Sequence, residues 1–275
     1  MNRVILGIHG LANKPPADIL ADWWEKSIRE GLKKNTGIDN ANFVFESVYW
    51  ADVMYDEPNL KPENPYKEAG EGELKTYEDS WMDLVRAKVL DWGGDILDTA
   101  KKCLGIDRTA DAVLEHKLKD LSKYYQDETV RNTLRSRLRD KILENRDNRI
   151  MLLAHSMGTI IAYDVLRDMG KHYPRLVIDH FVTLGSPLGL PHVKYKIAQE
   201  SNYVRTPSIV KRWSNFADKR DPVALDVHLA GDYAPNSDGV RVKDDLIAND
   251  WGGLYHHSFG YLRAPEVSKA IRDFI

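Results

Sequence analysis

The chain is poor in cysteine: its 275 residues include only Cys103. A lone cysteine excludes an intrachain disulfide and the paired-thiol motifs that bind zinc or carry redox chemistry. Disulfide-dependent proteins belong to oxidising compartments, whereas chains with few cysteines suit a reducing one. We therefore expect a cytoplasmic protein.

Long apolar runs are also absent. No stretch approaches the roughly 18 residues that a membrane-spanning helix needs. The first ten residues contain a short apolar run that breaks at His9-Gly10 and has no small-residue cleavage site, so they fit a strand better than a signal peptide. We expect no membrane span.

The sequence has no excess of charge of one sign, since 39 Lys and Arg residues face 42 Asp and Glu residues and give a net charge of −3. This balance provides no field that would attract nucleic acid or anionic lipid. With 43% hydrophobic and 29% charged residues, the composition is that of a globular protein and excludes disordered, collagen-like and coiled-coil classes. No nucleic-acid partner is expected, and the sequence gives no indication of oligomeric state.

Several cofactor motifs are missing as well. The chain has no His-Glu-x-x-His, no Cys-x-x-Cys, no P-loop, and no Gly-x-Gly-x-x-Gly after a strand. We therefore expect neither a catalytic metal nor a nucleotide cofactor. The carboxylates Asp244, Asp245 and Asp250 are interpreted as surface acids.

Apolar runs alternate with helical patterns along most of the chain. Strands are predicted at residues 3–9, 43–50, 149–154, 177–184 and 209–216, with a further β-like segment at 240–242 followed by an acidic helical turn. The runs are continuously apolar, which is typical of parallel strands covered on both faces. The order predicts an α/β fold, a mostly parallel sheet of about six strands with helices on both faces.

Residues 52–148 separate the second and third predicted strands, far more than a crossover helix needs. Apolar residues recur at helical spacing around 81–96 and again at Leu134, Leu138 and Ile142, so each stretch has a face to bury. We predict one domain, residues 1–275, with a helical insertion at about 52–148 that could cover the site.

The strongest functional signal is the segment 154–158, Ala-His-Ser-Met-Gly, between an apolar strand and a helical pattern. A strand-to-helix turn this sharp strains the backbone of Ser156 and requires small residues two positions before and after it, as Ala154 and Gly158 are. The strained turn exposes the serine hydroxyl, and the Met157 N–H at the helix start can face a developing oxyanion. This context predicts a nucleophilic serine; the alternative is an ordinary turn capped by serine. His155 is assigned to packing, because its position on so tight a turn directs it away from the hydroxyl.

These residues resemble the α/β-hydrolase superfamily, in particular bacterial lipase-like and GPI-inositol-deacylase-like serine hydrolases. The resemblance covers most of the chain outside residues 52–148. It rests on residues 5–11 (Ile-Leu-Gly-Ile-His-Gly-Leu), 154–158, 183–187 (Thr-Leu-Gly-Ser-Pro) and the two segments considered next. In such enzymes the residue after the first strand's His-Gly supplies a second oxyanion N–H, which implies Leu11 here. The chain departs from the family in having Ala154 where glycine is more frequent, and because the first predicted strand starts at residue 3 we expect the two leading antiparallel strands of the full fold to be absent.

The resemblance also implies the order of the remaining catalytic groups, an acid after the fifth predicted strand and then a histidine. Asp221 is preferred because its Asp-Pro-Val context is similar to the turn after the acid in related hydrolases. Asp218 remains the alternative, although it could cap the turn. Asp226 lies further from the strand end and is a weaker third choice.

Three histidines follow these acids. His228 comes only seven residues after Asp221, with no strand between to return it to the serine. The pair His256 and His257 follows a glycine break and opens the pattern His-x-Ser-aromatic-Gly-Tyr. The resemblance favours His256, and His257 stays open.

A serine hydroxyl becomes nucleophilic when a neutral imidazole takes its proton and a carboxylate orients that imidazole. We expect a serine hydrolase that cleaves a carboxylic ester or thioester through an acyl-enzyme. Its catalytic groups would be Ser156, Asp221 and His256, with an oxyanion hole from the N–H groups of Leu11 and Met157. Esters are favoured over amides because the resemblance is to lipases. Two alternatives stay open: acyl transfer to an alcohol or amine by the same residues, and a non-catalytic protein that docks through residues 52–148.

Overall fold

The computed structural model describes residues 2–72, 74–78, 121–224, 226–252 and 255–275. Within them, six strands form one sheet in the order β2-β1-β3-β4-β5-β6, and every neighbouring pair is parallel. The strands are β1 (Arg3–Ile8), β2 (Val44–Val48), β3 (Arg149–His155), β4 (His180–Leu184), β5 (Trp213–Ala217) and β6 (Val242–Leu246). The predicted α/β fold is confirmed.

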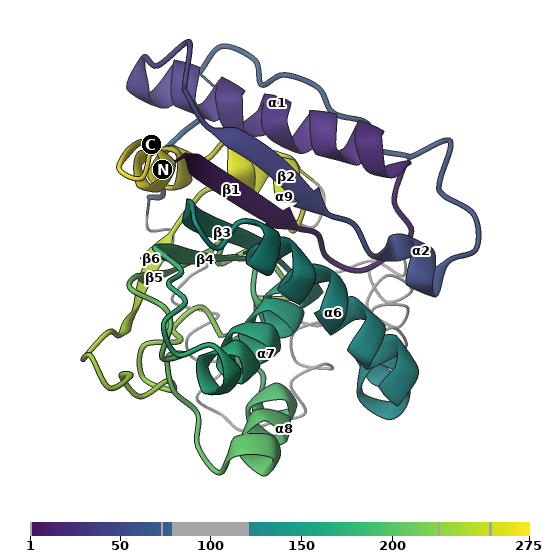
Figure 1. Ribbon diagram of the computed structural model, residues 1–275. Coiled ribbons are helices and arrows are strands. Elements are labelled where there is room, and N and C mark those ends of the chain that lie inside the picture. The colour runs from purple at the N-terminus through teal and green to yellow at the C-terminus, as the bar shows by residue number, and fades with distance from the viewer. Residues whose placement is uncertain (1, 73, 79–120, 225, 253–254) are drawn as a thin grey trace, which may run out of the picture.

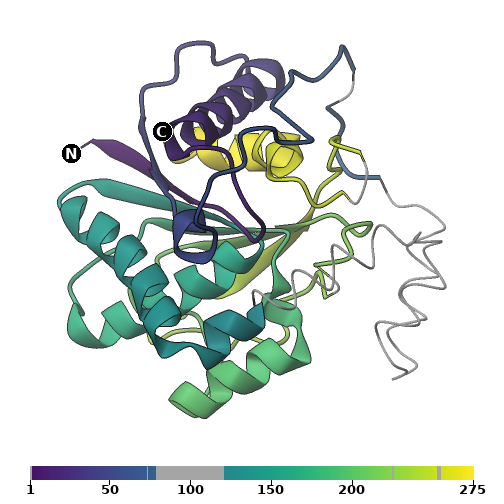
Figure 2. The same cartoon turned by 90° about the vertical axis from the view of Figure 1, so that its right-hand side faces the viewer.

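Helices cover both faces of the sheet (Figures 1 and 2). Helix α1 (Ala17–Thr36) lies on one face beside α9 (Ser258–Leu262) and α10 (Pro265–Arg272). Helices α6 (Glu128–Glu144) and α7 (Met157–His172) pack together on the other face. The shorter elements are α2 (Ala51–Met54), the 3₁₀ turn η1 (Pro187–Gly189) and α8 (Pro191–Ser201). No helix in the described ranges is long and apolar enough to cross a bilayer.

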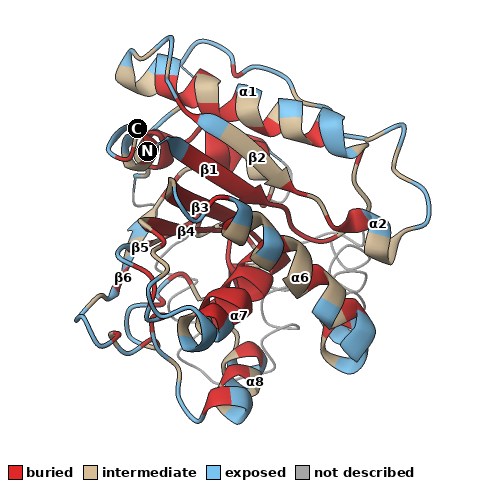
Figure 3. Cartoon of the chain, viewed as in Figure 1, coloured by how far each residue is buried: buried red, intermediate tan, exposed pale blue. Residues whose placement is uncertain are grey.

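The central strands β1, β3 and β4 are buried almost throughout, because successive side chains enter hydrophobic layers on opposite faces of the sheet. In β1, Val4, Leu6 and Ile8 join the cluster under α6 and α7, whereas Ile5 joins the cluster under α1 and α10. Side chains alternate across a strand, so a strand buried on both faces has no polar position. Figure 3 shows the result: the central strands and α7 are buried almost throughout, and the outer faces of α1 and α6 are exposed.

The apolar face predicted around residue 138 is present on α6. Leu134, Leu138 and Ile142 are fully buried and belong to the same cluster as the side chains of α7. Asp127 is the N-cap of this helix, and its carboxylate accepts the Val130 N–H at 3.0 Å. The helical pattern predicted around 81–96 lies outside the described residues.

Two predictions near the last strand are wrong. The acidic helical turn after residue 242 is strand, because β6 continues to Leu246. In this strand the Asp244 carboxylate accepts the backbone N–H groups of Leu229 and Ala230 at 2.9 and 2.8 Å, so hydrogen bonds compensate the charge of an acid in this edge strand. Asp250 is not a surface acid, since its side chain is buried against Arg263.

Arg263 links the two ends of the chain through buried charges. Its guanidinium lies 3.0 Å from Glu30 of α1 and 2.5 Å from Asp250, and it is 1% exposed. Removing one partner of a buried ion pair leaves uncompensated charge, at a cost of about 3 to 5 kcal/mol. We expect Arg263→Met to lower the free energy of unfolding by that amount in urea titrations. The matched change Arg272→Met, at an exposed pair with Asp273, is expected to cost less than about 1 kcal/mol, and equal losses would contradict this assignment.

Candidate active site

Ser156 occupies the junction between β3 and α7 in a strained backbone conformation, with φ 55° and ψ −131°. Its N–H donates to the Leu184 carbonyl at 3.0 Å, which ties the turn to the neighbouring strand. A Cβ at residue 158 would lie 2.6 Å from the carbonyl oxygen of His9, so only glycine fits there. The small residues around the serine therefore let β1 approach the turn closely.

The loop after β1 passes directly beside Ser156. Because β1 pairs with β3 in the register Ile8 to Ala154, the carboxyl ends of the two strands are adjacent. A Cβ on Gly10 would lie 2.5 Å from the Ser156 Cβ, so the loop could not come this close with any other residue. The N–H groups of Leu11 and Met157 donate to no backbone acceptor among the described residues.

His9 holds this loop in place as a neutral imidazole, a role that sequence reasoning missed. Its Nδ1–H donates to the Gly10 carbonyl at 2.8 Å, and its Nε2 accepts the Trp50 N–H at 3.0 Å. The ring also stacks on the Trp50 indole with centroids 4.6 Å apart. Burial, helped by the nearby positive charge of Lys14, lowers the pKa of His9 to about 3, so the ring stays uncharged. The sequence shows only that Trp50 lies two residues beyond β2, the strand that pairs with β1, and no spacing rule connects it to His9.

His256 lies between the serine and a carboxylate. Its Nε2 is 2.8 Å from Ser156 Oγ, and its Nδ1 is 2.6 Å from Asp221 Oδ2. A carboxylate only accepts, so Nδ1 carries the proton and Nε2 accepts the serine hydroxyl. All three side chains are buried, with Ser156 1%, Asp221 0% and His256 8% exposed. The structure thus brings together the three residues chosen from the sequence, in the geometry that proton transfer from a serine requires.

Asp221 sits in the turn after β5, where its carboxylate is held by several donors. Oδ1 accepts the Val223 N–H at 2.8 Å, and Oδ2 accepts the Tyr261 hydroxyl at 2.8 Å. A Cβ on Gly185 would lie 2.8 Å from Oδ2, so the end of β4 also packs against this group. Such a carboxylate is fixed in orientation before any substrate arrives.

The alternative acids make other contacts. Asp218 forms an ion pair with Arg220 at 2.6 Å and accepts the Asn249 N–H at 2.7 Å. Asp226 accepts a hydrogen bond from the backbone N–H of His228. His228 itself is exposed. Neither carboxylate has a hydrogen bond to His256.

The two remaining histidines near the site also have structural contacts. His257 stacks on Trp251 with centroids 4.8 Å apart and is the N-cap of α9. The sequence predicts a packing role for His155, and its ring lies 4.8 Å from that of His256, with its Nε2–H donating to the His256 carbonyl at 2.9 Å. His155 therefore packs against the histidine loop and also holds it by a hydrogen bond.

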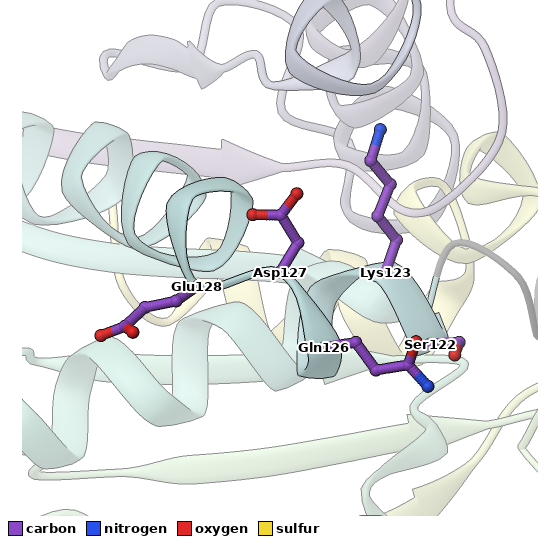
Figure 4. A pocket seen from close by; sticks show the side chains of 5 residues that line it. All are labelled: Ser122, Lys123, Gln126, Asp127 and Glu128. Atoms are coloured by element: carbon purple, nitrogen blue, oxygen red, sulfur yellow. The ribbon is translucent and has the colours of Figure 1, made fainter.

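No group of three or more His, Cys, Asp or Glu side chains among the described residues is arranged to hold a metal ion. A surface hollow of about 530 Å³ occurs at the start of α6, shown close up in Figure 4. It is lined by Ser122, Lys123, Gln126, Asp127 and Glu128, all exposed, and by none of the three side chains described above.

Comparison of the chain with protein-family models gives no match, and comparison with curated proteins gives none either.

Proposed function

We propose that the protein is a serine hydrolase of the α/β-hydrolase type that cleaves a carboxylic ester or thioester through an acyl-enzyme. The observation that carries the proposal is the hydrogen-bonded chain from Ser156 through His256 to Asp221, with the serine at a strained strand-to-helix turn. A strained serine conformation has an energetic cost, and such strain is concentrated at functional sites.

In the first half-reaction, Ser156 Oγ attacks the substrate carbonyl while His256 Nε2 takes the hydroxyl proton. Asp221 stabilises the imidazolium that forms and keeps Nδ1 as the protonated nitrogen. The carbonyl oxygen becomes an oxyanion, for which the N–H groups of Leu11 and Met157 are the proposed donors. One such donor contributes about 3 to 4 kcal/mol in a comparable enzyme.

The tetrahedral intermediate then collapses, and His256 gives its proton to the departing alkoxide or thiolate. The acyl group remains on Ser156 as an ester. In the second half-reaction His256 deprotonates a water molecule, which attacks this ester; collapse of the second intermediate releases the acid and restores the serine hydroxyl.

A fluorophosphonate probe tests this proposal directly, because it phosphonylates only a serine with an activated hydroxyl. We expect intact-protein mass spectrometry to show one adduct, and peptide mapping to place it on Ser156, in parallel with hydrolysis of p-nitrophenyl esters. A folded protein that takes up no probe, or that takes it up on another residue, would contradict the proposal.

A further inference from the structure

The hydroxyl of Tyr261 touches the acid of the proposed triad. It lies 2.8 Å from Asp221 Oδ2 and 3.0 Å from the backbone nitrogen of Asp218. A backbone N–H only donates and a carboxylate only accepts, so the hydroxyl accepts from Asp218 and donates its own proton to Asp221. Tyr261 is fully buried, so bulk water does not compete for this hydroxyl.

Tyr261 and His256 donate to the same carboxylate oxygen, since the His256 Nδ1 lies 2.6 Å from Oδ2. A donor to a carboxylate stabilises its charged form and spreads its negative charge. The tyrosine therefore competes with the imidazole for Oδ2, and its presence sets how strongly Asp221 attracts protonated His256.

The tyrosine remains a donor across the working pH range. Burial, with the negative charge of Asp221 as the second cause, raises the pKa of Tyr261 well above its ordinary value. Charged or titratable groups beside this site include His155 of β3, whose ring lies 4.8 Å from that of His256, and Asp218 in the turn after β5, which is paired with Arg220.

The fold delivers both donors on one segment. His256 comes just before α9 and Tyr261 lies within it, and Ser27 of α1 anchors the helix by donating to the Phe259 carbonyl at 2.9 Å. A Cβ on Gly185 would lie 3.0 Å from the Tyr261 ring, so the end of β4 leaves space for it.

We propose that Tyr261 is a positioning residue of this site. Its hydroxyl fixes the orientation of Asp221 Oδ2 toward His256 and weakens the electrostatic stabilisation that this carboxylate gives to the imidazolium. The inference rests on the proposed function for its effect on turnover. Its effect on the His256 pKa does not depend on any substrate.

The test is Tyr261→Phe, which removes the hydroxyl and keeps the ring. Without it, more negative charge remains on Oδ2 and imidazolium is stabilised, so the His256 pKa rises, by about half a unit to one unit. Histidine NMR titration would measure this shift, with the His256 signal identified by its loss in His256→Gln. The acid limb of kcat/KM for an ester should move to higher pH by the same amount, and the plateau should fall about 10-fold.

Tyr163→Phe is the matched control. The Tyr163 hydroxyl is also buried and also bridges, donating to the Arg205 carbonyl at 2.7 Å and accepting the Arg205 N–H at 3.3 Å, but it contacts neither Asp221 nor His256. It should lose stability and leave the His256 pKa unchanged. An unchanged His256 pKa in Tyr261→Phe, or equal shifts in both variants, would overturn the inference.

A second change guards against a variant that does not fold. Incorporation of 3,5-difluorotyrosine at position 261 keeps the hydroxyl and makes it a stronger donor, so the His256 pKa should fall instead of rise. A shift in the same direction as Tyr261→Phe would overturn the inference.

The proposed function and this inference can fail separately. If wild-type protein hydrolyses no ester and takes up no fluorophosphonate, the proposed function fails. If it does both and the His256 pKa is the same in the wild type and in the variants at position 261, only this inference fails.

Discussion

Ser156→Ala is expected to lower kcat/KM for p-nitrophenyl esters by about 10⁴- to 10⁶-fold, because triad residues act as a unit and little activity remains when one is removed. Ser156→Gly should lose as much activity. Glycine adopts φ 55° without the strain that serine bears, so this second variant should also gain stability, on the order of 1 kcal/mol. Opposite changes in activity and in urea midpoint would identify a serine held in a costly conformation for chemistry.

The control for this prediction is Ser268→Ala, which removes another buried serine hydroxyl, one on α10 that donates to the carbonyl of the N-cap residue Ala264. It should keep its activity and its fluorophosphonate adduct. Residual turnover in Ser156→Ala within about 10-fold of wild type would mean that the reaction does not pass through this serine.

Asp221→Asn is expected to lower kcat by about 10⁴-fold, because an amide that donates to Nδ1 favours the wrong imidazole tautomer. Circular dichroism should remain that of the wild type, since asparagine has the same shape. The loss should therefore appear in the pre-steady-state rate of acyl-enzyme formation.

Asp218→Asn is the matched comparison, because it makes the same change three residues earlier in the same turn. Its cost should fall on stability, since Arg220 loses its buried partner, and kcat should stay within about 10-fold of wild type. If Asp218→Asn impaired acylation more than Asp221→Asn did, the choice of acid would be wrong.

The fold was largely predictable because the central strands are buried on both faces and therefore appear in the sequence as apolar runs. The runs in β1, β2 and β3 predicted strands to within two residues of their observed ends. β4 and β5 begin three and four residues later than predicted. Ile178 and Val210, which precede these two strands, are buried but form only an isolated bridge. Their hydrophobicity therefore predicted that they are buried, but not that they lie outside the hydrogen-bonded strands.

The serine was the most predictable part of the site because its signal is local. Strand, small residues and helix are contiguous around Ser156, and each has a steric reason visible in the structure. The catalytic roles assigned to this serine, Asp221 and His256 remain predictions.

The acid was harder to choose because Asp218 and Asp221 share one turn and the same flanking strand. Apart from the local pairing of Asp218 with Arg220, the contacts that distinguish them are non-local: Tyr261 donates to Asp221, and the Asn249 N–H donates to Asp218. Residue spacing in the sequence does not predict which side chains more than 25 residues downstream will contact this turn. The contacts of His9 with Trp50 were missed for the same reason.

The anchoring of α9 on α1 has a consequence for synthesis of the protein. A ribosome that has finished the turn at Asp221 has made the serine and its acid, but not the imidazole that joins them. On the proposed mechanism the nascent polypeptide is inert at this stage, since nothing can take the serine proton. On the same mechanism, activity would begin once the segment carrying His256 has emerged and Ser27 has formed its hydrogen bond with the Phe259 carbonyl. Turnover would therefore report that the late-made helices have docked against the first one.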